Sequence, residues 1–527
     1  MNLTRRQAAA FGLATVLAHS LRVDAAEAGM VVRSGGQPQN LDPHQIFDVP
    51  MMGYALNVYD TLYRYEDNPP KMQPWLAESH TASADGLEWT FKLRPGVTFH
   101  DGSPLSAADV VYSFQRVLGL GKAPSSAFKP ILKPEHITAP DAQTVMFKLD
   151  KPYGPFLSAI PIVAIVNPRL LKAHEVTGDW GAAWLSSNDA GSGAYVLDPA
   201  SYTPLERLDL HRFRTHFLGW GDNPHPVETV AFRLAHETST GVLGLLNGSI
   251  DMTDSYLPTD QVEQISSSKL ARVAKNTSMR TFVIRMNNGK PPFDNINARK
   301  CFAHAFNYKG FIEDILKGYA DRDGTPMPNT LWGFPKDAQT YEYDLGKAKD
   351  YYKKAVAEGA PMKRPIEIHI QSQLEQTNQA AQLFQSDLAE IGINLKIIND
   401  TWANLTTNTA KAESTPDMWI HWVSTYFVDP ENWVGQMYDS QFAGTWKASS
   451  WYKNAKVDAL LAKGRSLVVQ EERLPIYEEA TKQIMADCVD IWIYNTVELQ
   501  GLSRRLANYR FCPAGSGGEM RWIQLTA

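Results

Sequence analysis

Residues 76–118 constrain the fold more than any other part of this chain. Apolar and polar side chains alternate over residues 87–93, and this period of two predicts a half-buried β-strand. Residues 94–96 read Arg-Pro-Gly and predict a turn, because proline fixes φ and glycine can adopt a positive φ. Val97 and Phe99 predict the start of a return strand. The stretch therefore begins as a strand, a turn and a second strand.

A capped helix is expected at the end of this stretch. Ser106 has the character of an N-cap residue, and Asp109 stands at the third helical position, an acidic variant of the capping box. Val110, Phe114 and Val117 then recur at helical spacing. Further along the chain, residues 366–370 are expected as a strand, residues 379–391 as a helix and residues 393–398 as another strand, and this β-α-β order fits an α/β lobe.

The amino-acid sequence of this stretch resembles the signature of the family 5 solute-binding proteins of ABC importers, the oligopeptide-, dipeptide- and nickel-binding group. Three blocks carry the likeness: Pro74–Ser79, Asp85–Pro104 and Ser106–Phe114. Weaker matches extend it over essentially the whole chain after the N-terminal segment. The resemblance implies an α/β, two-lobe periplasmic binding protein fold, type II-like and of cluster C, with an extra subdomain on the first lobe.

The resemblance also implies domain boundaries. We expect a signal peptide, a first lobe in three pieces, a subdomain inserted into it and a second lobe, over residues 1–28, then 29–75 with 190–290 and 490–527, then 76–189, and finally 291–489. Within the first lobe, residues 45–53 are expected as a loop that either faces the ligand or lies on the surface, and residues 57–63 as the helix after it.

Composition excludes several classes of function. The 527 residues carry a formal net charge of −6 and no basic run, so the sequence gives no electrostatic reason to expect nucleic-acid binding. The three cysteines form no CxxC or Cys/His cluster, so neither a zinc site nor any other metal or cofactor is expected. Cys488 and Cys512 could pair in an oxidising compartment, although scattered cysteines are more often buried thiols.

The N-terminal segment predicts export to the periplasm. Arg5 and Arg6 precede a weakly apolar run, and residues 26–28 form an A-x-A cleavage site. The paired arginines favour the twin-arginine route, with a Sec signal as the alternative. No later apolar run reaches the roughly 20 residues that a membrane helix needs.

The segment Met418–Trp433 is the expected ligand-binding region. Trp422 and Tyr426 match family positions, and in the family's peptide binders an Asp between them captures the ammonium group of the ligand. Thr425 stands at that position here. Either Asp429 or Glu431 replaces this Asp, or the ligand lacks a free amine. The expected ligand contacts are Asp48, Met51, Trp402, Trp422, Thr425, Tyr426, Asp429 and Trp433.

The resemblance implies a receptor that closes around a peptide or peptide-like solute and delivers it to the permease of an ABC transporter, acting as a monomer. A nickel chelate, an opine or a glycoside are alternative ligands within the same family. An exported hydrolase is the alternative of another class, but the surroundings of Ser192 fail the G-x-S-x-G pattern, and no HExxH or P-loop is present.

Overall fold

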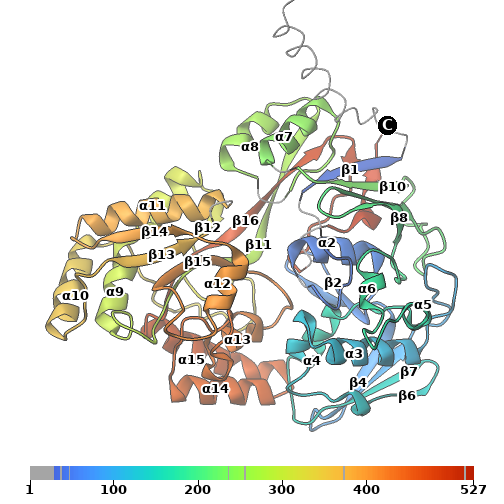
Figure 1. Ribbon diagram of the computed structural model, residues 1–527, viewed down its shortest axis with the longest axis horizontal. Coiled ribbons are helices and arrows are strands. Elements are labelled where there is room, and N and C mark those ends of the chain that lie inside the picture. Colours follow the sequence, from blue (N-terminus) through green and yellow to red (C-terminus); the bar gives the residue numbers. More distant parts are fainter. Residues whose placement is uncertain are drawn as a thin grey trace, which may run out of the picture.

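Two long strands join the two lobes of the chain. The structure is a computed structural model, and it describes residues 29–35, 38–46, 48–235, 237–254, 257–371, 374–514 and 518–526. The strands β11 (Ala271–Met286) and β16 (Asp490–Ser503) pair antiparallel and run from one lobe into the other (Figure 1). The expected signal peptide lies outside the described residues. Among the described helices, none is long and apolar enough to cross a membrane.

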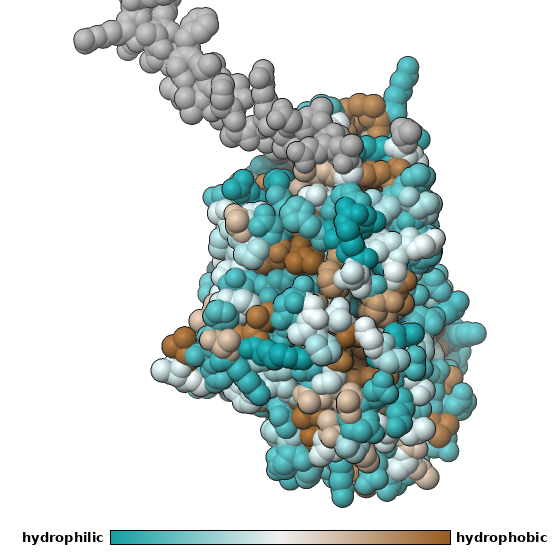
Figure 2. Space-filling model, turned by 90° about the vertical axis from the view of Figure 1, so that its right-hand side faces the viewer, coloured by the Kyte–Doolittle hydropathy of each residue, from teal (hydrophilic) through white to brown (hydrophobic). Residues whose placement is uncertain are grey.

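The first lobe contains a four-stranded sheet in the order β1-β10-β9-β8, in which only β1 and β10 are parallel. Figure 2 shows that the outer face of this lobe is mostly hydrophilic, with separate hydrophobic patches. The strands and helices of this part are β1 (Met30–Ser34), α2 (Val49–Val58), β2 (Tyr63–Glu66), β3 (Lys71–Pro74), β8 (Tyr195–Thr203), β9 (Arg207–Arg212), β10 (Thr229–Arg233), α7 (Thr238–Asn247), α8 (Thr259–Ser266), β17 (Leu506–Ala507) and β18 (Gln524–Leu525).

A second four-stranded sheet, in the order β4-β5-β7-β6, is formed between residues 77 and 148. The elements of this part of the chain are β4 (Ala77–Ala82), β5 (Glu88–Leu93), α3 (Ala107–Leu120), η1 (Ala123–Ala127), η2 (Pro134–His136), β6 (Ile137–Asp141), β7 (Thr144–Lys148), α4 (Phe156–Ala159), η3 (Ile160–Ile162), α5 (Pro168–Ala173) and α6 (Ala182–Leu185). The predicted strand and capped helix are confirmed as β5 and α3. The N–H and the hydroxyl of Ser106 both donate to Asp109 Oδ2, at 2.7 and 2.9 Å.

Two local predictions are wrong. The return strand expected at Val97 forms only one isolated bridge, between Thr98 and Pro104, because β5 pairs with β4 and β7 instead. The helix expected over 57–63 lies earlier, as α2. Asp48 caps that helix by accepting from the N–H of Met51 at 2.9 Å, so most of the expected ligand-facing loop is helical. The helix ends at Val58, whose carbonyl accepts from the N–H of Gly193 at 2.9 Å.

The second lobe is built on the other end of β11 and β16. Its six-stranded sheet has the order β12-β16-β11-β15-β13-β14, and helices cover both faces (Figure 1). The remaining elements are α9 (Ile296–Ala305), η4 (Gly310–Ile315), β12 (Ala320–Asp321), α10 (Leu345–Ala357), β13 (Ile366–Ile370), α11 (Glu375–Ala389), β14 (Leu395–Asn399), α12 (Trp402–Asn408), β15 (Met418–Val423), η5 (Glu431–Gly435), α13 (Gln436–Tyr438), η6 (Ser440–Phe442), α14 (Ala455–Ser466), α15 (Gln470–Ala486) and η7 (Met520–Trp522), the last of which returns to the first lobe.

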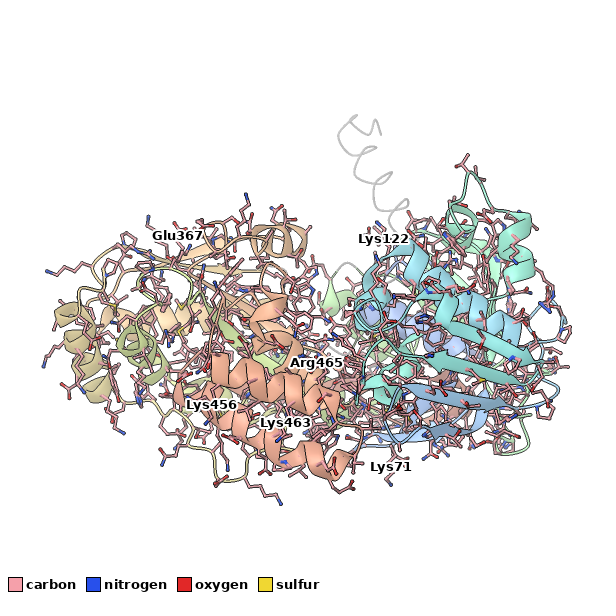
Figure 3. All side chains as sticks on the ribbon, turned by 90° about the horizontal axis from the view of Figure 1, so that it is seen from below. Lys71, Lys122, Glu367, Lys456, Lys463 and Arg465 are labelled. Carbon is pink, nitrogen blue, oxygen red and sulfur yellow. The ribbon has the colours of Figure 1, made fainter. Side chains whose placement is uncertain are left out.

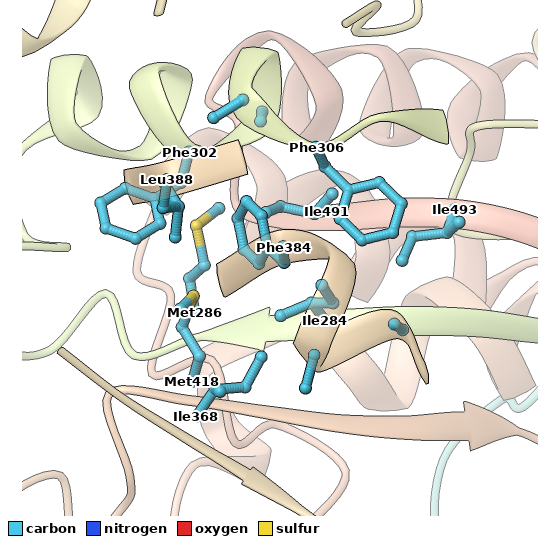
Figure 4. Close-up of a cluster of buried hydrophobic side chains, with 14 of the residues drawn as sticks. Ile284, Met286, Phe302, Phe306, Ile368, Phe384, Leu388, Met418, Ile491 and Ile493 are labelled. Carbon is cyan, nitrogen blue, oxygen red and sulfur yellow. The ribbon is translucent and has the colours of Figure 1, made fainter. Parts of the chain in front are cut away.

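Apolar packing between this sheet and its helices forms the largest core. Figure 4 shows Phe302, Phe306 and Phe384 packed together with the strand residues Ile284 and Ile491. All five side chains are at most 1% exposed. Burial of this kind contributes about 25 cal/mol per Å² of apolar surface to the free energy of folding. The core therefore holds the sheet of the second lobe in place beside the cleft.

Candidate ligand-binding site

A cavity that is partly open to solvent lies between the first lobe and the segment after β15, with about 670 Å³ of empty space when the solvent at its mouth is included. Most of its wall comes from α2, from the residues around β2 and from η3, and Tyr426 closes it from the other side. The lining residues are Pro43, Met51, Met52, Ala55, Leu56, Tyr59, Thr61, Arg64, Tyr65, Pro161, Ile162, Ala164, Tyr426 and Ala514. The lining is largely apolar, which is the usual character of a small-molecule site.

The structure brings two of the expected contacts, Met51 and Tyr426, to the same cavity. Met51 comes from α2, and Asp48 lies one turn earlier as the exposed cap of that helix. Arg64 is the only charged residue in the described lining. Its guanidinium donates to Glu519 Oε1 at 2.7 Å and to the carbonyl of Tyr59 at 3.0 Å. Its charge is therefore already balanced within the first lobe.

Trp422 and Thr425 lie next to Tyr426 but deeper in the protein. Trp422 is 9% exposed, and its ring centroid lies 4.7 Å from that of Phe282 in the core of the second lobe. Thr425 is 2% exposed, and its hydroxyl has no hydrogen-bond partner in the part of the chain that the structure describes. A buried hydroxyl without a partner costs free energy. Thr425 itself does not line the cavity.

Asp429 and Glu431, the two candidates for the missing counter-charge, both have partners inside the second lobe. Arg473 donates to both oxygens of Asp429, at 2.7 and 2.8 Å. Glu431 accepts from Arg465 at 2.9 Å and from the hydroxyl of Tyr477 at 3.0 Å. Burial raises the pKa of Glu431, although Arg465 opposes the shift. The charge of each carboxylate is thus already used inside the second lobe, and neither residue lines the cavity.

The two remaining tryptophans also differ from each other. Trp402, on α12, is 39% exposed, and its ring lies 5.3 Å from that of Trp446, which in turn lies 6.4 Å from Tyr426. These three rings form an aromatic wall that leads to the cavity. Trp433 is 0% exposed and lies among the apolar side chains beneath α14 and α15, away from the cavity lining.

Sequence reasoning missed a group of buried charges where the crossing strands enter the first lobe. Glu498 on β16 is 1% exposed, Arg280 on β11 is 4% exposed, and Arg33 lies at the end of β1. Desolvation by burial raises the pKa of Glu498 to about 8. The signal was present, since Glu498 is the one charged residue in the apolar run 491–499.

The described residues offer no alternative chemistry based on metals or disulfides. Among them, no group of three or more His, Cys, Asp or Glu side chains is arranged to hold a metal ion. Cys301, Cys488 and Cys512 are all free thiols, so the open possibility of a Cys488–Cys512 disulfide is not realised. Burial raises the pKa of the Cys488 thiol to about 12, which makes it unreactive.

Comparisons with known proteins agree with this architecture. A probable D,D-dipeptide-binding periplasmic protein of Escherichia coli strain K12 is 29% identical over 492 residues, which cover 92% of each chain. Heme-binding protein A of Haemophilus influenzae is 26% identical over 87% of this chain and 85% of that protein. Among solved structures, an ABC transporter-associated periplasmic binding protein of Helicobacter pylori, in complex with the peptide STSA, has a TM-score of 0.82 at 25% identity, over 95% of this chain and 98% of that chain.

These likenesses confirm the predicted α/β fold with two lobes of the periplasmic binding protein type. The family model described as bacterial extracellular solute-binding proteins, family 5, middle region, matches residues 71–445, which is well over half of the chain. The chain therefore belongs to the family 5 bacterial extracellular solute-binding proteins.

Proposed function

We propose that this protein captures a peptide or peptide-like solute between its lobes and delivers it to the permease of an ABC transporter in the inner membrane. The observation that carries the proposal is the cavity between α2 and Tyr426, which draws its lining from both sides of the cleft. The relatives named above bind a D,D-dipeptide, heme and a peptide, and two of these three ligands are peptides. The protein acts as a monomer and needs no cofactor.

Closure of the lobes is part of the proposal. The N–H of Gly154, in the inserted subdomain, donates to the carbonyl of Arg465 at 2.8 Å. Arg465 lies at the end of α14 that faces the other lobe (Figure 3). These contacts join parts of the chain that hinge motion about β11 and β16 would separate. The closed form would hold the ligand and present it to the permease.

Within this site we propose Met51 and Tyr426 as direct contacts, with Trp422, Thr425 and Trp402 around them and Asp48 fixing the start of α2. Asp429 and Trp433 support the second lobe from inside. The boundaries proposed for the lobes and the inserted subdomain stay as the sequence predicts them.

Export is a further part of the proposal, since residues 1–28 carry the features of a signal peptide and the relatives include periplasmic proteins. We propose the twin-arginine route. Replacement of Arg5 and Arg6 by Lys should then abolish periplasmic accumulation in cells. If the yield is unchanged, the Sec route serves instead.

A hydrolase is less well supported. The hydroxyl of Ser192 donates to Asp60 Oδ2 at 2.8 Å, and Ser192 is 1% exposed. A nucleophilic serine needs a base on its hydroxyl and access to substrate. Incubation with a peptide mixture followed by mass spectrometry separates the classes, because a receptor retains intact peptides and a hydrolase releases fragments.

A thermal-shift screen tests capture directly. A solute that binds only the native state should stabilise it by about 2.7 kcal/mol at 100 times its dissociation constant. D,D- and L,L-dipeptides are the first solutes to test, then longer peptides, opines, glycosides, heme and nickel chelates. If no solute raises the melting temperature, capture between the lobes is refuted.

A further inference from the structure

One face of the helix α2 forms an apolar wall of the cavity. Met51, Met52, Ala55 and Leu56 all line the cavity, and residues one and four positions apart lie on the same side of a helix. Two residues of η3 add further apolar surface to the lining. Methionine side chains are flexible and polarizable, so they adapt to apolar groups of different shapes. The wall therefore suits an apolar group whose shape can vary from one ligand to another.

Small side chains leave the space that the cavity occupies. Ala55, Ala164 and Ala514 all line it, and Ala55 belongs to the helix face described above. Ala55 is half-buried, and a leucine in its place would add three carbon atoms at the wall of the cavity. Leucine is also a good helix former, so such a change is compatible with α2. Residue 55 is thus placed to limit the size of the group that enters.

The polar side chains of this lining are engaged with the protein itself. The hydroxyl of Thr61 donates to a backbone carbonyl at 2.5 Å, and that of Tyr65 donates to another at 2.9 Å. Arg64 is 5% exposed, and its guanidinium lies 2.7 Å from Glu519 and 3.7 Å from Asp60. A charged ligand group that entered would lose its water and would meet only a charge that is already paired. Burial of a charge under these conditions is costly.

Charged side chains of the first lobe gather in a second cavity that adjoins the first. Both cavities are lined by Leu56, Tyr65 and Ala514. Four charged residues appear in the described lining of the second cavity and not in that of the first: Glu66, Asp67, Arg510 and Glu519. The two cavities therefore differ in chemistry. A charged group of a ligand is better accommodated in the second cavity, and an apolar group in the first.

We propose that the first cavity binds an uncharged, apolar side chain of the captured peptide, and that Ala55 limits the size of this side chain. Met51, Met52 and Leu56 contact the side chain from α2, and Tyr426 covers it from the other side of the cleft. The inference rests on the proposed capture of a peptide-like solute and adds its chemical class, a peptide with an apolar side chain at this position. Burial of each CH₂ group contributes about fourfold in affinity, so the effect is measurable.

Matched peptides test the character of the bound side chain. The probes are dipeptides and tripeptides of alanine, in L and in D configuration, in which one residue at a time is replaced by leucine, aspartate, norleucine or lysine. Leucine and aspartate are similar in shape and differ in charge, and the same holds for norleucine and lysine. In calorimetric titrations, leucine and norleucine at one position of the peptide should strengthen binding at least tenfold over alanine. Aspartate and lysine at that position should give no gain.

Variants of α2 test where the side chain lies. Ala55→Leu should weaken binding of the leucine peptide at least tenfold and binding of the all-alanine peptide less than threefold, because only the larger side chain needs the space. Ala357→Leu is the matched control, since it adds the same atoms at an exposed position of α10. Met52→Glu is a second variant, which brings a carboxylate to the half-buried helix face that lines the cavity. It should reverse the order of the norleucine and lysine peptides.

The outcomes separate this inference from the general function. If charged and apolar side chains bind equally well at every position, capture of peptides stands and the apolar side-chain site is wrong. Tighter binding of the lysine peptide by the wild type would also overturn it, because the side chain would then lie in the second cavity.

A preference for leucine that neither α2 variant changes would place the side chain elsewhere and refute the inference. Melting temperatures of the ligand-free variants show whether they are folded, and Met52→Glu decides if Ala55→Leu is not. If another solute of the thermal-shift screen binds and no peptide does, capture of a solute stands and the inference fails. If no solute binds at all, the proposed function fails with it.

Discussion

The signature stretch 76–118 and the cleft segment 418–433 differ in what their polar side chains do. In the signature, His100 bonds to Asp189 and to the carbonyl of Gly193, and Asp109 bonds to Ser106. These bonds hold the inserted subdomain together and fix it to the turn at residues 191–195. In the cleft segment, Tyr426 lines the cavity and the hydroxyl of Thr425 has no partner among the described residues.

The difference shows that the stretch that identifies the family is mainly structural. The signature is recognisable because many of its residues serve the fold, and the fold is what relatives share. The cleft segment departs from the family pattern at Thr425, whose side chain forms no hydrogen bond among the described residues. We expect a change at such a position to affect the ligand more than the fold.

The largest expected effect is a loss of stability on substitution of Asp429. If this loss did not occur, the contrast between the signature and the cleft segment would no longer hold. Asp429→Asn removes one charge from an ion pair whose side chains are 0% and 3% exposed, and leaves Arg473 buried without its counter-charge. Stability should fall by about 3–5 kcal/mol, measured by denaturant unfolding. Asp85→Asn, at an exposed turn of the signature, is the control and should change stability by less than about 0.5 kcal/mol.

If Asp429→Asn left stability unchanged and weakened only free-amine ligands, Asp429 would be the counter-charge after all. The cleft segment would then carry its ligand chemistry in the place that the family pattern implies.

The next prediction concerns the signature residue His100, whose contribution to stability should depend on pH. Burial lowers the pKa of His100, but Asp189 and the carbonyl of Gly193 outweigh it, so the folded-state pKa is raised above 6.5. The stabilisation is fully present below pH 6.5 and is lost as the pH rises through the folded-state pKa. His100→Leu should cost about 1.5–3 kcal/mol at pH 6, the usual range for hydrogen bonds to a charged group, and less at pH 9.

Unfolding by urea at both pH values checks this, with His225→Leu, an exposed histidine, as the control. A cost that is the same at pH 6 and pH 9 would mean that His100 acts as a neutral side chain. Ligand affinity should not change, because His100 does not line the cavity.

Local patterns in the sequence predicted a large part of the fold. Alternation predicted β5, and the cap at Ser106 predicted α3, because both depend on neighbouring residues. The order of strand, helix and strand over residues 366–399 was predicted for the same reason. The start of α2 has a local signal in Asp48 and Pro50, which are typical of a helix start, whereas the family likeness places the helix later in the chain.

The candidate site was less predictable, because its chemistry depends on partners far apart in the chain. Asp429 meets Arg473, 44 residues later, and nothing near Asp429 indicates that its charge is already used. Glu498 and Arg33 meet only because the crossing strands return to β1. Burial and unsatisfied hydrogen bonds are properties of the folded chain, and a sequence shows only that a charge lies in an apolar run.

Gly154 contacts the second lobe through Arg465, and a variant at Gly154 tests whether this contact belongs to the proposed closure. A Cβ on Gly154 would lie 2.0 Å from the carbonyl oxygen of Leu467 and 2.9 Å from Nε of Arg473. Gly154→Ala should therefore disfavour the closed form and weaken ligand binding by about tenfold, or 1.4 kcal/mol. Gly221→Ala, which meets no atom within 4 Å, is the control. Unchanged affinity in the calorimetric titration would show that this contact does not depend on closure.

The smallest expected effect on stability and affinity is at Thr425. It is the most informative for the comparison of the two segments, because it separates ligand binding from stability. Thr425→Val keeps the shape of the side chain and removes a hydroxyl that has no partner in the described structure. Stability of the ligand-free protein should stay the same or rise by up to about 1 kcal/mol, since an unsatisfied buried group is removed. A ligand that bonds to this hydroxyl would lose about 0.5–1.5 kcal/mol of binding free energy, or roughly two- to tenfold in affinity.

Ser106→Ala is the matched change in the signature, and it should show the opposite pattern, with stability lower by about 1 kcal/mol and affinity unchanged. If Thr425→Val lowers stability and leaves affinity intact, Thr425 belongs with the structural residues, and the cleft segment contacts the ligand through Tyr426 without it.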